Sequence, residues 1–131
     1  MTTSIGTYRH LAQCSTPSGH FAILAVDHRG NLRQQLEKHA ASAGAGQVTE
    51  RTMTAFKQEV TNYLAPYASA VLTDPDYGFG PGIAEGTIGG KLGLLAPLEI
   101  TDYGVHPSLR ALNMIPGWTV GKIKRAGGSG V

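Results

Sequence analysis

Three consecutive ionisable residues, Asp27, His28 and Arg29, directly follow a short apolar run in the stretch "FAILAVDHRG". A carboxylate can take up protons or bind hydroxyl groups, an imidazole can donate or accept a hydrogen bond, and a guanidinium binds anionic groups. Two further acids, Asp74 and Glu99, also lie near the ends of apolar runs. These five side chains suit a small, hydroxylated and anionic ligand, provided that the fold brings them together.

The apolar runs before these residues read as β-strands. The first is nearly continuous in apolar residues and is bounded by glycines, which predicts a strand buried on both faces, as in a parallel sheet. We expect three strands, at residues 20–28, 68–78 and 92–100, and the start of a fourth near the end of the chain. The carboxyl ends of parallel strands share one edge of a sheet, where ligands bind.

The segments between these strands read as helices. Asn31 with Gln34 resembles a capping box for a helix over residues 31–41, and Thr49 can cap a longer one. The longer helix has an apolar face at steps of three and four residues, formed by Met53, Phe56, Val60 and Leu64. Shorter helices are expected at residues 8–14 and around residues 118–125. Alternating strands and helices predict an α/β fold with right-handed crossovers.

One alternative applies to each of the acids at the strand ends. A carboxylate in such a position can cap the following helix or brace a turn instead of facing a ligand. The alternative is strongest for Asp74, because the Asp-Pro pair in "TDPDYG" favours a turn. Glu99 is open to the same interpretation, and His28 can be a turn residue.

Composition narrows the class of protein. A chain of 131 residues makes at most one ordinary domain, and a formal net charge of +2 with scattered basic residues argues against a nucleic-acid or membrane partner. The N-terminal residues lack the pattern of a signal peptide, and no apolar stretch is long enough to span a bilayer. We therefore expect a soluble, cytoplasmic protein. The single cysteine, Cys14, rules out an internal disulfide.

The common cofactor and metal motifs do not fit. There is no phosphate-binding G-x-x-x-x-G-K-[ST] loop, and "GFGPGI" lacks the last glycine of G-x-G-x-x-G. A zinc site built from Asp27, His28 and Glu99 is a weak alternative, because no histidine pair has metal-ligand spacing. We expect neither a cofactor nor a metal.

Four ordered stretches carry a family resemblance: "FAILAVDHRGNLRQQL", "LAPYASAVLTDPDYG", "GLLAPLEITDY" and "IPGWTVGKIKRAGGSGV". Between about Tyr8 and Val131 the sequence resembles the class I tagatose 1,6-bisphosphate aldolases and the similar sulfofructosephosphate aldolases. The resemblance implies an incomplete (β/α)₈ TIM barrel: a single partial domain, residues 1–131, with three to four parallel strands and flanking helices. The family pattern A-x-D-Q-R-G matches Asp27 and Arg29 but has glutamine at the position of His28.

The resemblance also implies a reaction. A class I aldolase forms a Schiff base between a lysine and a ketose bisphosphate such as tagatose 1,6-bisphosphate, and reversibly releases dihydroxyacetone phosphate and glyceraldehyde 3-phosphate. We expect Lys38 and Lys57 on polar helix faces, Lys91 before its strand, and Lys122 and Lys124 facing outward, so none of them suits this role. The resemblance places the Schiff-base lysine beyond Val131.

The five site residues, Asp27, His28, Arg29, Asp74 and Glu99, are then expected to bind and position a phosphorylated sugar rather than to act as catalytic groups. We expect the chain to be a truncated part of an aldolase, inactive alone and prone to self-association through an unpaired strand edge. Two alternatives remain open. One is a truncated, non-catalytic sugar-phosphate-binding or scaffold protein, and the other is a sulfofructosephosphate aldolase.

Overall fold

The structure is a computed structural model, which describes residues 2–100 and 104–131. Its centre is a sheet of three parallel strands, β1 (Ile23–Val26), β2 (Ala70–Thr73) and β3 (Gly93–Leu95), in the order β1-β2-β3. Gly130 adds a single parallel bridge to Leu95, where a fourth strand was expected to start. The sequence-based prediction of an α/β fold with parallel strands is confirmed, although each strand is shorter than expected.

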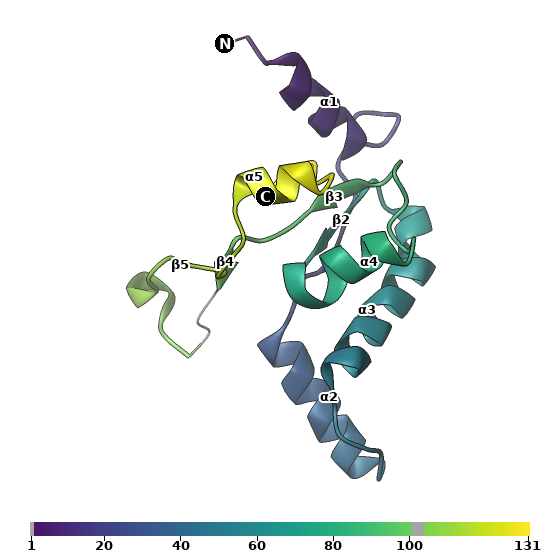
Figure 1. Cartoon of the computed structure of the whole chain (residues 1–131), viewed down its shortest axis with the longest axis vertical. Coiled ribbons are helices and arrows are strands. Elements are labelled where there is room, and N and C mark those ends of the chain that lie inside the picture. The colour runs from purple at the N-terminus through teal and green to yellow at the C-terminus, as the bar shows by residue number, and fades with distance from the viewer. Residues whose placement is uncertain (1, 101–103) are drawn as a thin grey trace.

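Helices connect the strands and extend from both ends of the sheet (Figure 1). In chain order they are α1 (Ile5–Gln13), α2 (Gly30–Ser42), α3 (Glu50–Leu64), α4 (Gly80–Ala84) and α5 (Val120–Arg125). Short turns of other helical types lie at Ala65–Tyr67, Pro75–Phe79 and Pro107–Leu109. Between β3 and α5 the chain forms a small antiparallel hairpin, β4 (Glu99–Ile100) with β5 (Asn113–Met114), which projects away from α2 and α3.

The hydrophobic core lies on one face of the sheet. Its buried residues come from β2, the Pro75–Phe79 turn, β3 and α5; they are Val71, Phe79, Leu94, Ala96 and Ile123. The ring of Phe79 packs edge to face on that of Trp118, with 5.7 Å between centroids. Helix α3 contacts β1 as well as the Pro75–Phe79 turn. The helical layer therefore covers this face.

The opposite face of the sheet is partly exposed at β1, contrary to expectation. We expected the first strand to be buried on both faces, but β1 alternates between exposed and half-buried residues, and Ile23 is 44% exposed. Leu24 and Val26 pack against the core, whereas Ile23 and Ala25 point to the other side. β1 is also at the edge of the described sheet, so one of its faces and one of its edges lack a neighbour there.

Helix α3 has the predicted start but only part of the predicted buried face. Thr49 caps it, as expected, and the structure adds a capping box between Thr49 and Thr52. The residues that the fold buries are Met53, Lys57 and Thr61, one turn apart, while Phe56 and Leu64 are 38% and 47% exposed. The prediction that Lys57 lies on the polar face is therefore wrong. The burial of its ammonium group is explained by two oxygen partners at the ends of β1 and β2.

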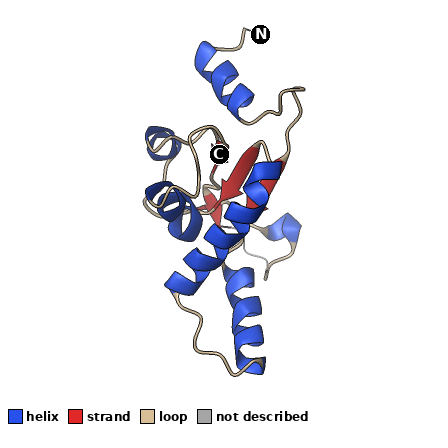
Figure 2. Ribbon diagram, turned by 90° about the vertical axis from the view of Figure 1, so that its right-hand side faces the viewer, coloured by secondary structure: helices blue, strands red, loops and turns tan. Residues whose placement is uncertain are grey.

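Helix α1 lies at one end of the molecule, away from α2 and α3 (Figure 2). Its C-terminus is held against the amino ends of the strands by the Ser69 hydroxyl, which donates to the Cys14 carbonyl at 2.5 Å and accepts from the Ala22 amide at 2.9 Å. Gly93 allows the close approach, because a Cβ atom there would lie 2.8 Å from Cys14. In the described part of the chain, no helix is sufficiently long and apolar to cross a membrane.

Candidate functional site

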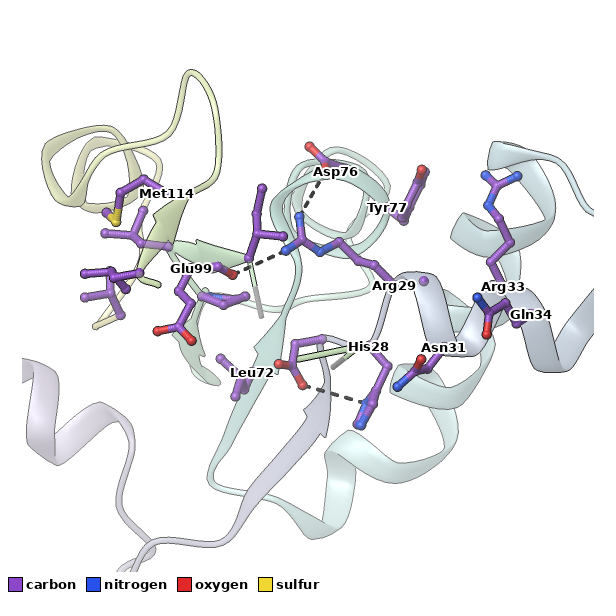
Figure 3. Close-up of a pocket in the computed structure, with 18 residues that line it drawn as sticks. His28, Arg29, Asn31, Arg33, Gln34, Leu72, Asp76, Tyr77, Glu99 and Met114 are labelled. Atoms are coloured by element: carbon purple, nitrogen blue, oxygen red, sulfur yellow. Dashed lines mark hydrogen bonds and ion pairs between the residues drawn. The ribbon is translucent and has the colours of Figure 1, made fainter. Parts of the chain in front are cut away.

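A cavity of about 980 Å³ opens at the carboxyl ends of the three strands (Figure 3). Its walls come from the start of α2, the turn after β2, and the β4–β5 hairpin with the segment before it. The residues with polar side chains that line it are Asp27, His28, Arg29, Asn31, Arg33, Gln34, Asp76, Tyr77 and Glu99. Four of the five residues that the sequence singled out therefore border one cavity.

Asp27 and His28 follow β1 immediately. The Asp27 side chain is 31% exposed, and its Oδ1 lies 3.8 Å from Nδ1 of His28. His28 is the more accessible of the two, at 61%. Since the carboxylate and the imidazole lie side by side at the cavity wall, together they can accept and donate hydrogen bonds to hydroxyl groups.

The Arg29 guanidinium is held between two other parts of the cavity wall. Its Nη1 lies 3.6 Å from Oδ2 of Asp76, and its Nη2 donates to the backbone oxygen of Glu99 at 3.3 Å. The side chain is 23% exposed. Figure 3 shows the Arg29 side chain reaching from the end of β1 toward Asp76 in the turn after β2 and Glu99 in the hairpin. A guanidinium fixed in this way presents its remaining donors to an anion.

The beginning of α2 adds a second feature that favours an anion. Arg29 is its N-cap residue, the structure shows no side-chain cap at this helix end, and the first turn contains no acid. Gly30 and Asn31 of this turn line the cavity. Backbone N–H groups at a helix N-terminus carry a partial positive charge. The predicted capping box of Asn31 with Gln34 is wrong, because the helix starts one residue earlier and Asn31 lies inside its first turn.

Glu99 lines the cavity, but from a different element than expected. The third strand was predicted to run to residue 100, whereas β3 ends at Leu95 and Glu99 lies in β4. Pro97, which has no N–H to donate to a ladder, lies between the two strands. Glu99 therefore approaches Arg29 from the hairpin, with its backbone oxygen accepting the guanidinium hydrogen bond.

Asp74 lies outside the residues that border the cavity. It is fully buried, and its Oδ1 accepts hydrogen bonds from the amides of Asp76 and Tyr77 at 3.1 and 2.9 Å. Its Oδ2 lies 2.5 Å from Nζ of Lys57. The geometry matches the alternative reading of "TDPDYG", in which this acid braces the turn, and the Asp76 two residues later faces the cavity instead.

Lys57 also donates to the Val26 carbonyl oxygen at 2.5 Å. Burial lowers the pKa of this lysine, and the hydrogen bond to Asp74 opposes that shift. Sequence reasoning missed Lys57, although its spacing of four residues from both Met53 and Thr61 placed it on a common helix face. It also missed the cavity residues Asp76 and Tyr77, which the turn after Asp74 could have indicated.

Across residues 2–100 and 104–131, no group of three histidine, cysteine, aspartate or glutamate side chains has the geometry to hold an ion. The cavity combines a guanidinium, a helix N-terminus, carboxylates and an imidazole. This combination fits a ligand with both anionic groups and hydroxyls.

The fold and the cavity define an α/β protein with a polar cavity at the carboxyl edge of a parallel sheet. No protein-family model matches the chain. Tagatose 1,6-diphosphate aldolase 2 of Enterococcus faecalis is 30% identical over 131 residues, which are all of this chain and 37% of that protein. Tagatose 1,6-diphosphate aldolase 1 of Streptococcus pyogenes serotype M1 is 31% identical over 94% of this chain and 36% of its own length.

Tagatose 1,6-diphosphate aldolase 2 of Streptococcus mutans is also 31% identical, over 95% of this chain and 36% of its length. The curated relatives of this chain are thus tagatose 1,6-diphosphate aldolases, and the chain spans little more than a third of their length. The family resemblance seen in the sequence is confirmed.

Proposed function

We propose that this chain forms the first part of a (β/α)₈ barrel aldolase and that its cavity binds a ketose bisphosphate such as tagatose 1,6-bisphosphate. The observation that carries the proposal is the position of Arg29. Its guanidinium and the uncapped first turn of α2 border the same cavity as Asp27. Phosphate oxygens suit the guanidinium and the helix N-terminus, and sugar hydroxyls suit the carboxylate.

The open sheet face supports the barrel. In a barrel, one face of the sheet packs against helices and the other lines the interior, where side chains from all strands fill the space. Here α3, α5 and the turn after β2 cover one face, and Ile23 on the other face is partly exposed. Further strands next to β1 and after β3 would bury that face. We infer that the chain by itself self-associates through the same surface.

The chain's own residues would act on the substrate without forming the covalent bond to it. In a Schiff-base mechanism, a lysine amine condenses with the ketone, and the resulting iminium accepts the electron pair released when the carbon–carbon bond breaks. Lys57 is buried and paired, and none of the five lysines, all of them described, lines the cavity. The nucleophile then belongs to a part of the barrel outside residues 1–131.

Asp27, His28 and Arg29 would therefore hold the sugar in a fixed pose. The guanidinium would bind a phosphate, and the carboxylate would accept hydrogen bonds from hydroxyls along the carbon chain. Glu99 faces the same space and would contact the substrate from the hairpin. The absence of a lysine at the cavity also favours a second reading, in which the chain binds a sugar phosphate without reacting with it.

Arg29→Gln is the variant that tests the binding role. We expect D-tagatose 1,6-bisphosphate to bind the unmodified chain, and the affinity to fall at least about tenfold in the variant, since a charge-assisted hydrogen bond to phosphate is lost. Isothermal titration calorimetry measures both affinities.

Arg125→Gln is the matched control, because Arg125 is exposed on α5 and does not border the cavity. This control should bind as the unmodified chain does. Equal affinities for the Arg29 and Arg125 variants would refute the proposed site.

A further inference from the structure

Lys57 and Asp74 form a buried ion pair between the ends of two neighbouring strands. The pair has 2.5 Å between Nζ and Oδ2, and the two side chains are 1% and 0% exposed. Lys57 reaches it from α3, and Asp74 directly follows β2. Neither residue lines the cavity, so the proposed function gives the pair no part in contacting the substrate.

On the lysine side, the pair connects to the start of the cavity wall. The same Nζ donates to the Val26 carbonyl, and Val26 directly precedes Asp27. The ammonium group thus fixes the backbone at the point where β1 ends and the Asp27–Arg29 segment begins.

On the aspartate side, the pair connects to the opposite wall. Oδ1 of Asp74 accepts from the amides of Asp76 and Tyr77 and so holds the turn after β2. The carboxylate of Asp76 in this turn lies beside the Arg29 guanidinium. Contacts therefore run without a break from the end of β1, through Lys57, Asp74 and Asp76, back to Arg29.

Stability alone is a weak reason for such a pair. The free energy lost when two charges are removed from water is about as large as the free energy gained from their attraction. A protein with well-packed apolar residues in place of a buried ion pair is therefore often equally stable. Two strand ends that must present side chains to one ligand, however, have to be held at a fixed separation. A pair that bridges those ends meets this need.

We propose that Lys57 and Asp74 are positioning residues. Their ion pair fixes the separation between the Asp27–Arg29 segment and the Pro75–Phe79 turn, and this separation directs the Arg29 guanidinium into the cavity. The inference rests on the proposed function, because it assumes that Arg29 receives an anionic sugar. It assigns a role to two residues outside the cavity wall.

The double variant Lys57→Met/Asp74→Asn separates positioning from folding. It removes both buried charges together, so no unpaired charge is left inside, and the net charge is unchanged. The asparagine oxygen can still accept from the amides of Asp76 and Tyr77. Asp74→Asn alone is the second variant, because it keeps the turn and removes only the charge that pairs with Lys57. Lys124→Met/Glu59→Gln repeats the same chemical changes at two exposed positions and serves as control.

Two measurements on the full chain are needed. The first is the ¹⁵N–¹H heteronuclear NOE of the Arg29 Nε–Hε group, which reports the order of the guanidinium without any ligand. The second is the affinity for D-tagatose 1,6-bisphosphate by calorimetry. In the double variant and in Asp74→Asn we expect the NOE of Arg29 to fall by about half, as for a side chain that becomes mobile. We expect the affinity to fall about tenfold, while the control variant matches the unmodified chain in both measurements.

An Arg29 signal that is unchanged in the folded variants would overturn the inference, whatever the affinity. A lower Arg29 NOE in both Asp74 variants, with an unchanged control, would support it. If the unmodified chain fails to bind the bisphosphate, the proposed function fails, and the Arg29 signal still decides whether the pair positions this side chain.

Discussion

His28 is the residue at which this chain departs from the A-x-D-Q-R-G pattern of the aldolases that its sequence resembles. It lies at the cavity wall, and its side chain is 61% exposed. We expect His28→Gln to change the free energy of unfolding by less than about 0.5 kcal/mol, as is usual for an exposed site. Because an amide can also donate and accept hydrogen bonds, binding of D-tagatose 1,6-bisphosphate should stay within about threefold.

Thermal unfolding and calorimetry measure both quantities for His28→Gln. Arg29→Gln, the same replacement at the next position, is the comparison. A tenfold loss in the His28 variant would show that the imidazole itself contacts the ligand in a way that an amide cannot reproduce.

The position of a residue at the cavity was predictable where the course of the backbone alone determines it. Asp27 and Arg29 directly follow a strand, and the strand's end carries them to the cavity whatever their side chains contact. Asp74 occupies the matching position after β2, yet its carboxylate turns to the amides of its own turn and to Lys57. The orientation of the Asp74 carboxylate depends on Lys57 of α3, and the spacing of residues within "TDPDYG" does not reveal that lysine.

At the scale of elements, Gly93 determines how α1 meets the sheet. A Cβ at this position would lie 2.8 Å from the Cα and Sγ atoms of Cys14 and from the Gln13 carbonyl oxygen. We expect Gly93→Ala to destabilise the chain by about 1–3 kcal/mol, because the overpacked contact includes backbone atoms. The displaced helix end should also expose the buried Cys14 thiol.

Urea unfolding and the rate of iodoacetamide labelling test this expectation for Gly93→Ala. Burial raises the pKa of the Cys14 thiol, so labelling of the unmodified chain should be slow. Gly90→Ala is the control, since no atom lies within 4 Å of its added Cβ. If both variants label at the rate of the unmodified chain, α1 does not depend on the close contact at Gly93.

Elements with strong local signals were predicted well. The start of α3 at Thr49 is one example, because a threonine just before an apolar helical pattern is a signal carried by neighbouring residues. The face that α3 buries was predicted only in part. The burial of Lys57 was missed because its two partners, Val26 and Asp74, lie 31 and 17 residues away along the chain. The extent of β3 was overestimated for a similar reason: the apolar residues after Leu95 continue the pattern of the strand but belong to a connection and a hairpin.

At the scale of the whole molecule, the sheet is covered on one face only within the described residues. Helices cover one face, while β1 has an exposed face and a free edge within the described residues, and the family relatives are nearly three times as long. The family resemblance was evident from four sequence stretches, and the α/β order from the alternation of predicted strands and helices. The openness of β1 was not, since a continuous apolar run looks the same whether or not both of its faces are covered.

We propose above all that the cavity at the carboxyl ends of β1, β2 and β3 binds a ketose bisphosphate. Titration of ¹⁵N-labelled chain with D-tagatose 1,6-bisphosphate, followed by amide chemical shifts, tests it most directly. We expect saturable shifts at residues 27–31 and at Asp76 and Tyr77, with residues 5–13 of α1 unaffected. Shifts confined to regions outside the cavity, or none at millimolar ligand, would contradict it.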